Sequence, residues 1–420
     1  MKRIVIFPIF LLLSATLFGC TVTSEQEKDY SSQEITIYAS ESEEQFFYQS
    51  YGNLILEHFP GLEIRVITPP YEMLGQTNVE EIKKHAPDLI VSYTNDYKEL
   101  VADSYLSSID NLIKKDSFDI DKYSNSMISY LRDESGVLYG LSPDAYISGI
   151  FYNKDLINHI GLDHPTNGMD WFELLQLATR FTNGIAGFEN SSNPSGLLMN
   201  IAATNGWYFI DKEMNEITFE IGEWEKAIQT IVDLYDANSF VKGSGDLFFQ
   251  GKSALYEGNL SYVTKLLDTN EFTWGVITQP VNTNSRNVSQ SVGFNRVLSI
   301  PTESTHRELA WDIMKVLMSE EAAEHYEDNQ LSTTISTLKT HMYNYKGINL
   351  EAFWEQSINS SPNILNDELT REFINEFYSL LDDSLYKTIN HEISVEECFE
   401  LIIKGAEEAY DKERLRNANK

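Results

Sequence analysis

The chain has 420 residues, with 31 Lys and Arg against 64 Asp and Glu, which gives a formal net charge of −33 at pH 7. Apolar residues make up 42% of it and aromatic residues 12%, so it is too rich in core-forming side chains for a disordered protein. A chain this acidic repels nucleic-acid phosphate, so we expect no nucleic-acid partner. The only two cysteines, Cys20 and Cys398, exclude a disulfide scaffold and any multi-cysteine metal site.

The first twenty residues have the pattern of an export signal. Lys2 and Arg3 precede an apolar run, Ile4 to Leu13, which is shorter than the roughly 20 residues that a transmembrane helix needs. The leader ends in Leu17-Phe18-Gly19-Cys20, which resembles a bacterial lipobox, the motif whose cysteine becomes the lipidated first residue of the mature protein. An ordinary signal peptide with a chance cysteine is the alternative.

The lipobox interpretation predicts how the start of the chain is used. Residues 1–19 would be a signal peptide, and Cys20 would carry acyl chains such as palmitate. Residues 20–33, which are polar after the cysteine, would be the lipidated residue and a flexible tether. We therefore expect the protein at the extracellular face of the cytoplasmic membrane, held there by its lipid anchor alone.

The ordered body begins with a pattern of alternating strands and helices. Strand-like runs occur at 34–39, 62–67 and 87–92, the last of them short and mostly apolar, as in a buried parallel strand. A helical pattern covers 43–58 and is broken by Pro60-Gly61. Strands that alternate with helices predict βαβ units and an open parallel sheet, and so an α/β fold.

The middle of the chain is helical in pattern, and the body has neither an internal repeat nor a long Pro/Gly linker. Asp170 is placed to cap a helix over 171–181 whose apolar positions form one stripe. Thr305 and Glu308 have the spacing of a capping box before another amphipathic helix. Cys398 lies in a periodic apolar stretch, which predicts a buried helical thiol.

Several short motifs follow one another between residues 34 and 345. They are Tyr139-Gly140-Leu141-Ser142-Pro143, Tyr152-Asn153-Lys154, Gly161-Leu162 with Pro165 and Trp171-Phe172-Glu173-Leu174, Phe249-Gln250-Gly251-Lys252-Ser253-Ala254-Leu255, Trp274-Gly275-Val276 with Pro280, and Ala310-Trp311. In this order they resemble the extracellular solute-binding proteins of family 1, lipoproteins that feed ABC importers for sugars and related solutes.

The resemblance implies a two-lobe, periplasmic-binding-protein-like fold of type II, in which each lobe is a mixed or parallel sheet flanked by helices and the lobes are hinged around a ligand cleft. Residues 34–145 with 296–335 would form the N-terminal lobe, and 146–295 with 336–420 the C-terminal lobe. The chain would cross between them near 144–148, 293–296 and 331–335. A ligand that touches both lobes then favours the closed form through its differential affinity.

Candidate binding residues lie at the ends of predicted strands, because ligands lie outside the carboxyl ends of parallel strands, and also at the predicted hinge, at the return crossing and after the Asn205-Gly206 turn. Carboxylates and amides would bind hydroxyl groups, and aromatic faces would cover the apolar side of a sugar ring. The candidates are Ser40, Glu41, Tyr71, Tyr93, Asn95, Asp144, Tyr146, Trp207, Glu257, Asn259 and Asn295. Gly258 lies between Glu257 and Asn259, and Phe294 precedes Asn295.

Each candidate also has a structural interpretation. Glu41 would serve as the N-terminal charge of the helix after it, and Asp144 would cap a turn after Pro143. Tyr71 would be an ordinary loop aromatic. Trp207 would anchor its loop to the core, although in the resembling family an aromatic residue from this region of the second lobe often stacks on a sugar ring.

The sequence lacks a convincing catalytic motif, and we expect a receptor rather than an enzyme, without a cofactor or a metal. It would be a monomer that binds a sugar or oligosaccharide and passes it to the permease subunits of an ABC transporter. Two alternatives stay open: the same fold with a peptide or cationic ligand, and an extracellular lipoprotein glycoside hydrolase that uses two carboxylates.

Overall fold

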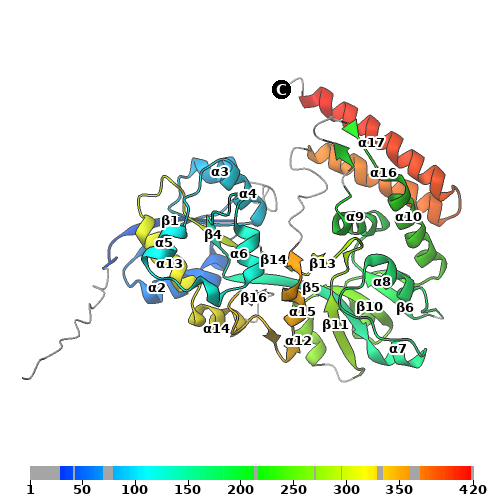
Figure 1. Cartoon of the computed structure of the whole chain (residues 1–420), viewed down its shortest axis with the longest axis horizontal. Coiled ribbons are helices and arrows are strands. Elements are labelled where there is room, and N and C mark those ends of the chain that lie inside the picture. Colours follow the sequence, from blue (N-terminus) through cyan, green and yellow to red (C-terminus); the bar gives the residue numbers. More distant parts are fainter. Residues whose placement is uncertain are drawn as a thin grey trace, which may run out of the picture.

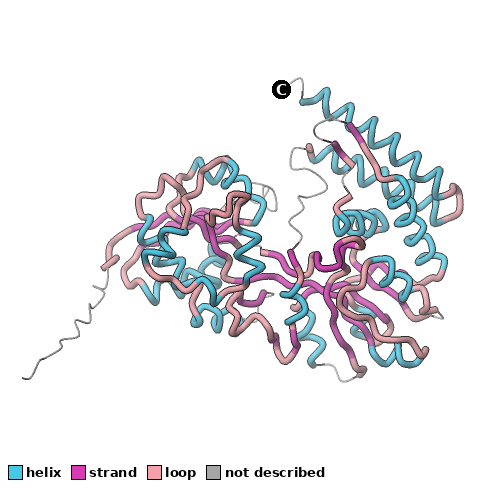
Figure 2. Tube along the Cα trace, in the orientation of Figure 1, coloured by secondary structure: helices cyan, strands magenta, loops and turns pink. Residues whose placement is uncertain are grey.

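The computed structural model describes residues 29–40, 43–69, 79–182, 184–207, 209–211, 216–268, 271–294, 296–328, 334–358 and 369–417. These residues form two lobes joined by extended segments in the middle of the molecule (Figure 1). Strands run through the centre of both lobes and helices lie around them (Figure 2). The α/β, two-lobe fold predicted from the sequence is therefore confirmed.

The first lobe is built on a five-stranded sheet of order β2-β1-β3-β15-β4. Its strands are β1 (Glu34–Ala39), β2 (Glu63–Ile67), β3 (Leu89–Ser92), β4 (Gly140–Leu141) and β15 (Val297–Ser299). β1 is parallel to both β2 and β3, whereas β15 returns from the second lobe and runs antiparallel to β3 and β4. The three strands predicted at the start of the body are thus present and parallel.

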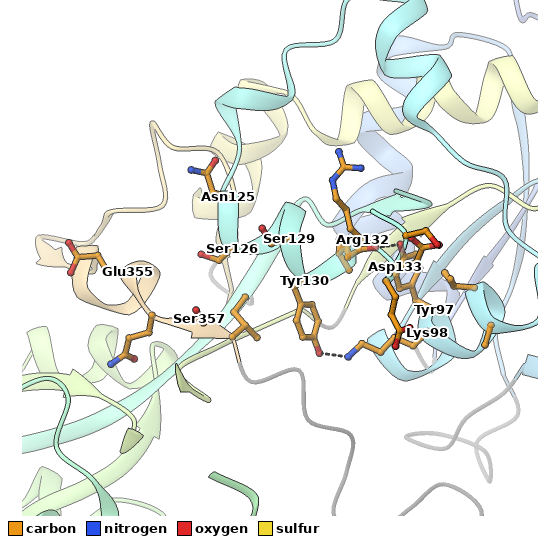
Figure 3. Close-up of a pocket in the computed structure, with 17 residues that line it drawn as sticks. Tyr97, Lys98, Asn125, Ser126, Ser129, Tyr130, Arg132, Asp133, Glu355 and Ser357 are labelled. Atoms are coloured by element: carbon orange, nitrogen blue, oxygen red, sulfur yellow. Dashed lines mark hydrogen bonds between the residues drawn. The ribbon is translucent and has the colours of Figure 1, made fainter. Parts of the chain in front are cut away.

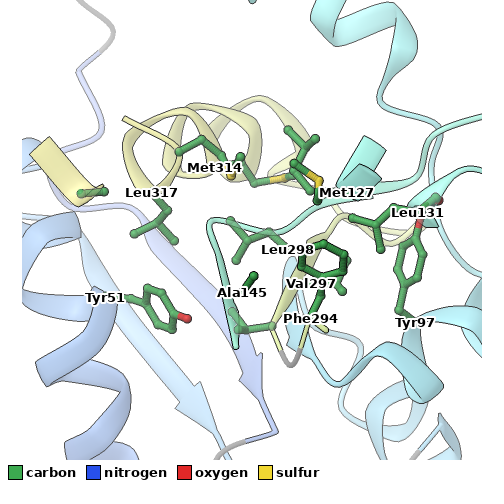
Figure 4. Close-up of a cluster of buried hydrophobic side chains, with 14 of the residues drawn as sticks. Tyr51, Tyr97, Met127, Leu131, Ala145, Phe294, Val297, Leu298, Met314 and Leu317 are labelled. Carbon is green, nitrogen blue, oxygen red and sulfur yellow. Dashed lines mark hydrogen bonds between the residues drawn. The ribbon is translucent and has the colours of Figure 1, made fainter. Parts of the chain in front are cut away.

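Helices cover this sheet, and several of them are short. They are α1 (Glu44–Phe47), the π-helical turn η1 (Tyr48–Gly52), α2 (Asn53–His58), α3 (Val79–Lys84), α4 (Thr94–Ala102), α5 (Asp110–Lys115), the 3₁₀ turn η3 (Ile120–Lys122), α6 (Asn125–Leu131), α13 (Arg307–Leu317) and α14 (Glu320–Asp328). Beneath them, side chains from distant parts of the chain, such as Tyr97, Met127, Leu298 and Met314, meet in one buried cluster (Figure 4).

The second lobe has a sheet of order β11-β5-β10-β6-β9, which mixes parallel and antiparallel pairs. Its strands are β5 (Asp144–Asn153), β6 (Ala186–Asn190), β9 (Phe240–Lys242), β10 (Ser253–Asn259) and β11 (Trp274–Thr278). The helices of this lobe are α7 (Lys154–His159), α8 (Trp171–Ala178), α9 (Pro194–Asn205), α10 (Ile221–Asp236), α11 (Asp246–Phe249), α12 (Ser261–Leu267), α16 (Arg371–Ile389) and α17 (Val395–Asn417). Short pairs β7 (Ile210–Asp211) with β8 (Glu216–Ile217), and β12 (Val281–Asn282) with β13 (Ser285–Ser289), complete it.

Aromatic side chains dominate the core of the second lobe. Phe209 stacks on Phe377 with 4.5 Å between ring centroids, and the fully buried Trp224 contacts Phe219 edge-on. Phe377 comes from α16, so the C-terminal helix pair is part of this core rather than an appendage. Cys398 is fully buried in α17, as predicted for a helical thiol.

Two predicted helix starts have different outcomes. Asp170 caps α8 as predicted, in a capping box with Glu173: its Oδ1 accepts from the Glu173 N–H at 2.9 Å. The capping box predicted for Thr305 and Glu308 is wrong, because α13 begins at Arg307 and His306 stands at the N-cap position. The Thr305 hydroxyl lies 3.3 Å from Nδ1 of His306 instead of reaching a backbone N–H of the helix.

The last residues of the predicted tether are part of the folded body. The Ser32 N–H donates to the Gly61 carbonyl at 2.9 Å, and the Glu63 N–H donates to the Gln33 carbonyl at 2.8 Å. The Tyr30 hydroxyl binds the Asp312 carboxylate, and its ring contacts Phe59 edge-on. Residues 1–28, including Cys20, lie outside the described residues, so any tether ends near Tyr30 rather than at residue 33.

Candidate functional site

Three strands run side by side where the two lobes meet. The first residues of β5 pair antiparallel with β14 (Val292–Gly293) on one side and β16 (Thr334–Ser336) on the other. All three segments lie in or beside the ranges predicted as chain crossings. Three crossings at one place let the lobes rotate about a short common axis without unfolding either sheet.

Tyr146 lies at the centre of this junction, opposite Gly293. A Cβ atom added to Gly293 would come 2.2 Å from Cζ of Tyr146, so the ring lies directly against the glycine backbone. Only glycine allows this close approach. Tyr146 is half-buried, and burial together with the neighbouring Tyr130 raises its pKa.

Asp144, at the start of β5, is fully buried. Nη1 of Arg296 lies 3.5 Å from its Oδ2 and also donates to the Tyr51 hydroxyl at 2.9 Å. Burial raises the pKa of Asp144, and the Arg296 charge opposes that rise. In this conformation the carboxylate therefore faces protein groups of the junction, which favours a structural role over direct ligand contact.

A cavity of about 980 Å³ lies beside the junction (Figure 3). Its first-lobe wall comes from α4, α6 and residues 132–135, and the opposite side is formed by residues 355–358. The side chains include Lys98, Asn125, Ser126, Ser129, Tyr130, Arg132 and Gln356. The volume is at the upper end of the about 300–1,000 Å³ of ordinary ligand pockets, and the mixture of hydroxyl, amide and aromatic groups suits a polar organic ligand.

The segment 355–358 connects this cavity to both lobes. It begins with the last residue of α15 (Glu351–Glu355) and ends in β19 (Ser357–Ile358). β19 pairs with β13 of the second lobe. On the first-lobe side, the Ser126 hydroxyl donates to the Trp354 carbonyl at 3.1 Å. A movement of one lobe against the other would therefore change this wall of the cavity.

Tyr130 and Lys98 form the centre of the first-lobe wall. Nζ of Lys98 lies 4.3 Å from the centroid of the Tyr130 ring and 3.3 Å from its hydroxyl oxygen. Tyr130 also contacts Phe294, with 5.7 Å between ring centroids. Burial raises the pKa of Tyr130, so its hydroxyl stays protonated, and burial lowers the pKa of Lys98.

On the second lobe, the polar residues at the strand ends already have protein partners. Glu257 accepts hydrogen bonds from Asn190 and from Nε2 of Gln279, the latter at 3.1 Å. Burial raises the pKa of Glu257, although both amides favour the charged form. Oδ1 of Asn259 accepts from the N–H of Ser261 at 2.9 Å.

None of the candidates predicted from the sequence is among the residues that line this cavity, but three of them lie at strand ends of the first lobe. Tyr93 and Asn95 lie at the N-terminus of α4, one turn before Lys98, and the Thr94 hydroxyl between them binds the Phe294 carbonyl. Ser40, at the end of the adjacent β1, is buried, and its hydroxyl has no hydrogen-bond partner among the described residues. Glu41, Tyr71 and Asn295 lie outside the described residues, so their roles stay predictions.

Trp207 lies away from this group of residues. It is only 4% exposed and contacts Trp224, with 6.0 Å between ring centroids. Gly206 before it ends α9 in a left-handed conformation, with φ of 71°. This placement favours the alternative interpretation, in which Trp207 anchors its loop to the second-lobe core.

The cavity residues Lys98, Tyr130 and Gln356 were missing from the candidates. Lys98 could have been found by extending the strand-end rule one helical turn into α4, because Tyr93 and Asn95 are at the start of the same helix. Tyr130 and Gln356 lie on a helix and a late segment whose sequences carry no ligand-specific pattern.

The described part of the chain has neither a cluster of metal ligands nor a membrane-spanning helix. No group of three or more His, Cys, Asp or Glu side chains there is placed to hold a metal ion. Among the same residues, no helix combines the length and the apolar character needed to cross a membrane.

Three solved structures share this fold. The sugar-binding protein MalE of Xanthomonas citri matches with a TM-score of 0.67 at 14% identity, covering 92% of this chain and 100% of its own. An ABC substrate-binding protein of Listeria monocytogenes in complex with cycloalternan matches with a TM-score of 0.58 at 18% identity, covering 90% and 98%. A cyclic α-maltosyl-1,6-maltose binding protein of Arthrobacter globiformis gives 0.60 at 15% identity, covering 90% and 99%.

The two lobes, the three crossings and the cavity beside them define a solute-binding protein with a hinged fold. Residues 42–324 match the bacterial extracellular solute-binding protein family. The chain therefore belongs to that family, as its ordered motifs predicted. The family consists of extracellular solute-binding proteins, and the fold alone does not determine which solute is bound.

Proposed function

We propose that the protein is an extracellular, lipid-anchored receptor that captures a carbohydrate by closure of its two lobes and delivers it to an ABC importer. The observation that carries this proposal is the cavity shared between α4, α6 and residues 355–358. Family membership supports the class of receptor, and the proteins of similar fold include sugar-binding proteins.

The cavity offers the two kinds of contact that a sugar needs. Ser129, Tyr130 and Gln356 present hydroxyl and amide groups that bind sugar hydroxyls. The Tyr130 ring, which already contacts Phe294 and Lys98, would add apolar contact with C–H groups of the sugar. A volume of about 980 Å³ leaves room for more than one sugar unit, which favours an oligosaccharide over a monosaccharide.

Ligand screening tests the substrate class. The purified body would be melted with neutral and acidic oligosaccharides, peptides and amines, and each hit measured by calorimetry. A ligand present at about 100 times its Kd stabilises the folded state by roughly 2.7 kcal/mol. A carbohydrate recovered chemically unchanged supports a receptor. Turnover supports a hydrolase, and stabilisation by peptides or amines alone contradicts the sugar proposal.

Small-angle scattering tests the closure. The radius of gyration should fall when a tight carbohydrate ligand is added and stay constant with a sugar that does not bind. A tight ligand that leaves the scattering profile unchanged would contradict closure while leaving the assignment of the ligand intact.

Substitution of the proposed lipidation residue tests the anchor. Cys20→Ser should release the protein into the medium or stop its maturation, whereas Cys398→Ser, a change at the buried thiol, should leave membrane association unchanged. A Cys20→Ser protein of mature size that stays on the membrane would contradict lipid anchoring.

A further inference from the structure

Lys98 is a basic residue that lines the cavity and has no opposite charge beside it among the described residues. It is half-buried on α4, and its Nζ interacts with the ring and hydroxyl of Tyr130. It forms no ion pair with any residue in the described part of the chain. Burial alone lowers the pKa of Lys98, with no contribution from a neighbouring carboxylate.

The charged residues that share the cavity are engaged or directed elsewhere. Asp133 accepts from the Val137 N–H at 2.8 Å, and Arg132 donates to Asp110 at 3.1 Å. Glu134 and Glu355 are exposed, and Glu355 lies at the far side of the cavity from Lys98 (Figure 3). None of these side chains neutralises Lys98.

The Lys98 ammonium and the Tyr130 hydroxyl are two hydrogen-bond donors close enough together to bind the same ligand group. The Tyr130 oxygen accepts from the Lys98 ammonium at 3.3 Å, so its own O–H proton stays available. It donates to no other described residue. An anionic group with two oxygens can accept from both donors, and a hydrogen bond between charged partners is stronger and shorter than one between neutral partners.

We propose that the carbohydrate ligand of this cavity is acidic, and that a uronate carboxylate of the sugar binds Lys98 Nζ and the Tyr130 hydroxyl. This inference rests on the proposed function. The remaining hydroxyl and amide groups of the cavity then bind the neutral part of the sugar. The overall charge of −33 repels anions at long range, but salt screens that repulsion beyond about 8–10 Å, so the local pair dominates once the ligand is bound.

Matched sugar pairs test this inference by calorimetry. Trigalacturonate would be compared with galactotriose, and a glucuronate-bearing xylo-oligosaccharide with the unsubstituted one. At least one acidic member should bind about 10-fold or more tightly than its neutral partner. Its affinity should also fall with added salt, which the affinity of a neutral sugar does not do.

Three variants show whether Lys98 is the cause. Lys98→Gln should weaken binding of the acidic sugar by about 10–100-fold and change binding of a neutral sugar by no more than about 3-fold. Lys98→Arg, which keeps the charge, should restore most of the affinity for the acidic sugar. Lys114→Gln on the outer helix α5 is the control, since its side chain is exposed and away from the cavity, and it should bind like the unaltered protein.

The outcomes separate this inference from the proposed function. Binding of neutral sugars only, or an unchanged affinity of Lys98→Gln for the acidic sugar, overturns the acidic ligand and leaves a carbohydrate receptor. Failure of every carbohydrate to bind overturns the proposed function itself. Equal losses for acidic and neutral sugars in Lys98→Gln, with a lower melting temperature, would show a structural role of Lys98 and also overturn the inference.

Discussion

The strand ends of the two lobes differ in how their polar groups are used. In the second lobe, Glu189 and Glu257 are bonded to backbone N–H groups and amides of the same lobe. In the first lobe, the Ser40 and Ser92 hydroxyls lack a hydrogen-bond partner among the described residues, and Lys98 contacts only Tyr130 there. At these strand ends, the carboxylates of the second lobe are satisfied within that lobe, whereas the first lobe has polar groups without a hydrogen-bond partner among the described residues and a cation, Lys98, that lines the cavity.

Replacement of Trp207 tests this comparison most strongly. Trp207→Ala should lower the free energy of unfolding by about 3–5 kcal/mol, because a large side chain is removed from the aromatic core around Trp224. Ligand affinity of the folded fraction should change little. Denaturation and calorimetry would be measured side by side. A large loss of affinity with unchanged stability would instead place Trp207 in the binding site and break the comparison.

Replacement of Glu189 should have the next largest effect. Its carboxylate accepts from the N–H groups of Gly245, Leu247 and Phe248, at 3.0, 3.3 and 2.8 Å. Glu189→Gln turns one oxygen into a donor that faces these donors, and should cost about 2–3 kcal/mol in unfolding free energy. The exposed Glu223→Gln on α10 is the control and should be nearly neutral. A loss of ligand binding without a loss of stability would contradict the structural role of Glu189.

A substitution at the junction tests whether the two lobes are coupled through Tyr146. The Cβ of Gly293→Ala would collide with the Tyr146 ring, and we expect a loss of about 1–3 kcal/mol in stability together with a change in the compaction on ligand binding. Adding Tyr146→Leu should recover part of the stability, so the two effects should not be additive. Additive effects would show that the ring does not fix this junction.

The pH dependence of stability should show the smallest effect. The folded-state pKa of Glu257 is raised from its ordinary value of 4.5 by burial. The folded state then holds a proton that the unfolded state has released, so this group makes stability fall as pH rises from about 4.5 through the raised pKa. Glu257→Gln should reduce that fall in urea titrations between pH 4 and pH 8. An unchanged slope would show that Glu257 does not contribute to it.

The sequence predicted the fold better than the site, and particular residues show why. Strands at 34–39 and 89–92 have apolar patterns that follow directly from burial in a sheet, and both are present. The cap at Asp170 depends on residues three positions apart, so local spacing sufficed. The cap predicted at Thr305 was wrong because His306 and the nearby Asp88, in hydrogen-bond contact with it, set the start of α13.

The cavity depends on contacts that no local pattern contains. Lys98 and Tyr130 are 32 positions apart, and the wall opposite them comes from residues 355–358. The strand-end rule led to Tyr93 and Asn95, one turn from Lys98, because it concerns the sheet and not the helix that follows. Trp207 shows the opposite error: an aromatic residue after a turn has the same local sequence whether it faces a ligand or the core.

The docking of Tyr30 against Phe59 and Asp312 limits how the body can move if Cys20 is its anchor. Tyr30 lies ten positions after Cys20, and a fully extended chain over that span reaches about 35 Å. A chain of this size has a radius of gyration of roughly 20 Å, so the folded body is more than about 40 Å across. The segment between Cys20 and Tyr30 is therefore shorter than the width of the body. If Cys20 is the anchor, the folded body would then stay close to the lipid surface. The edge around α2 and α13, where Tyr30 is bound, would face the membrane.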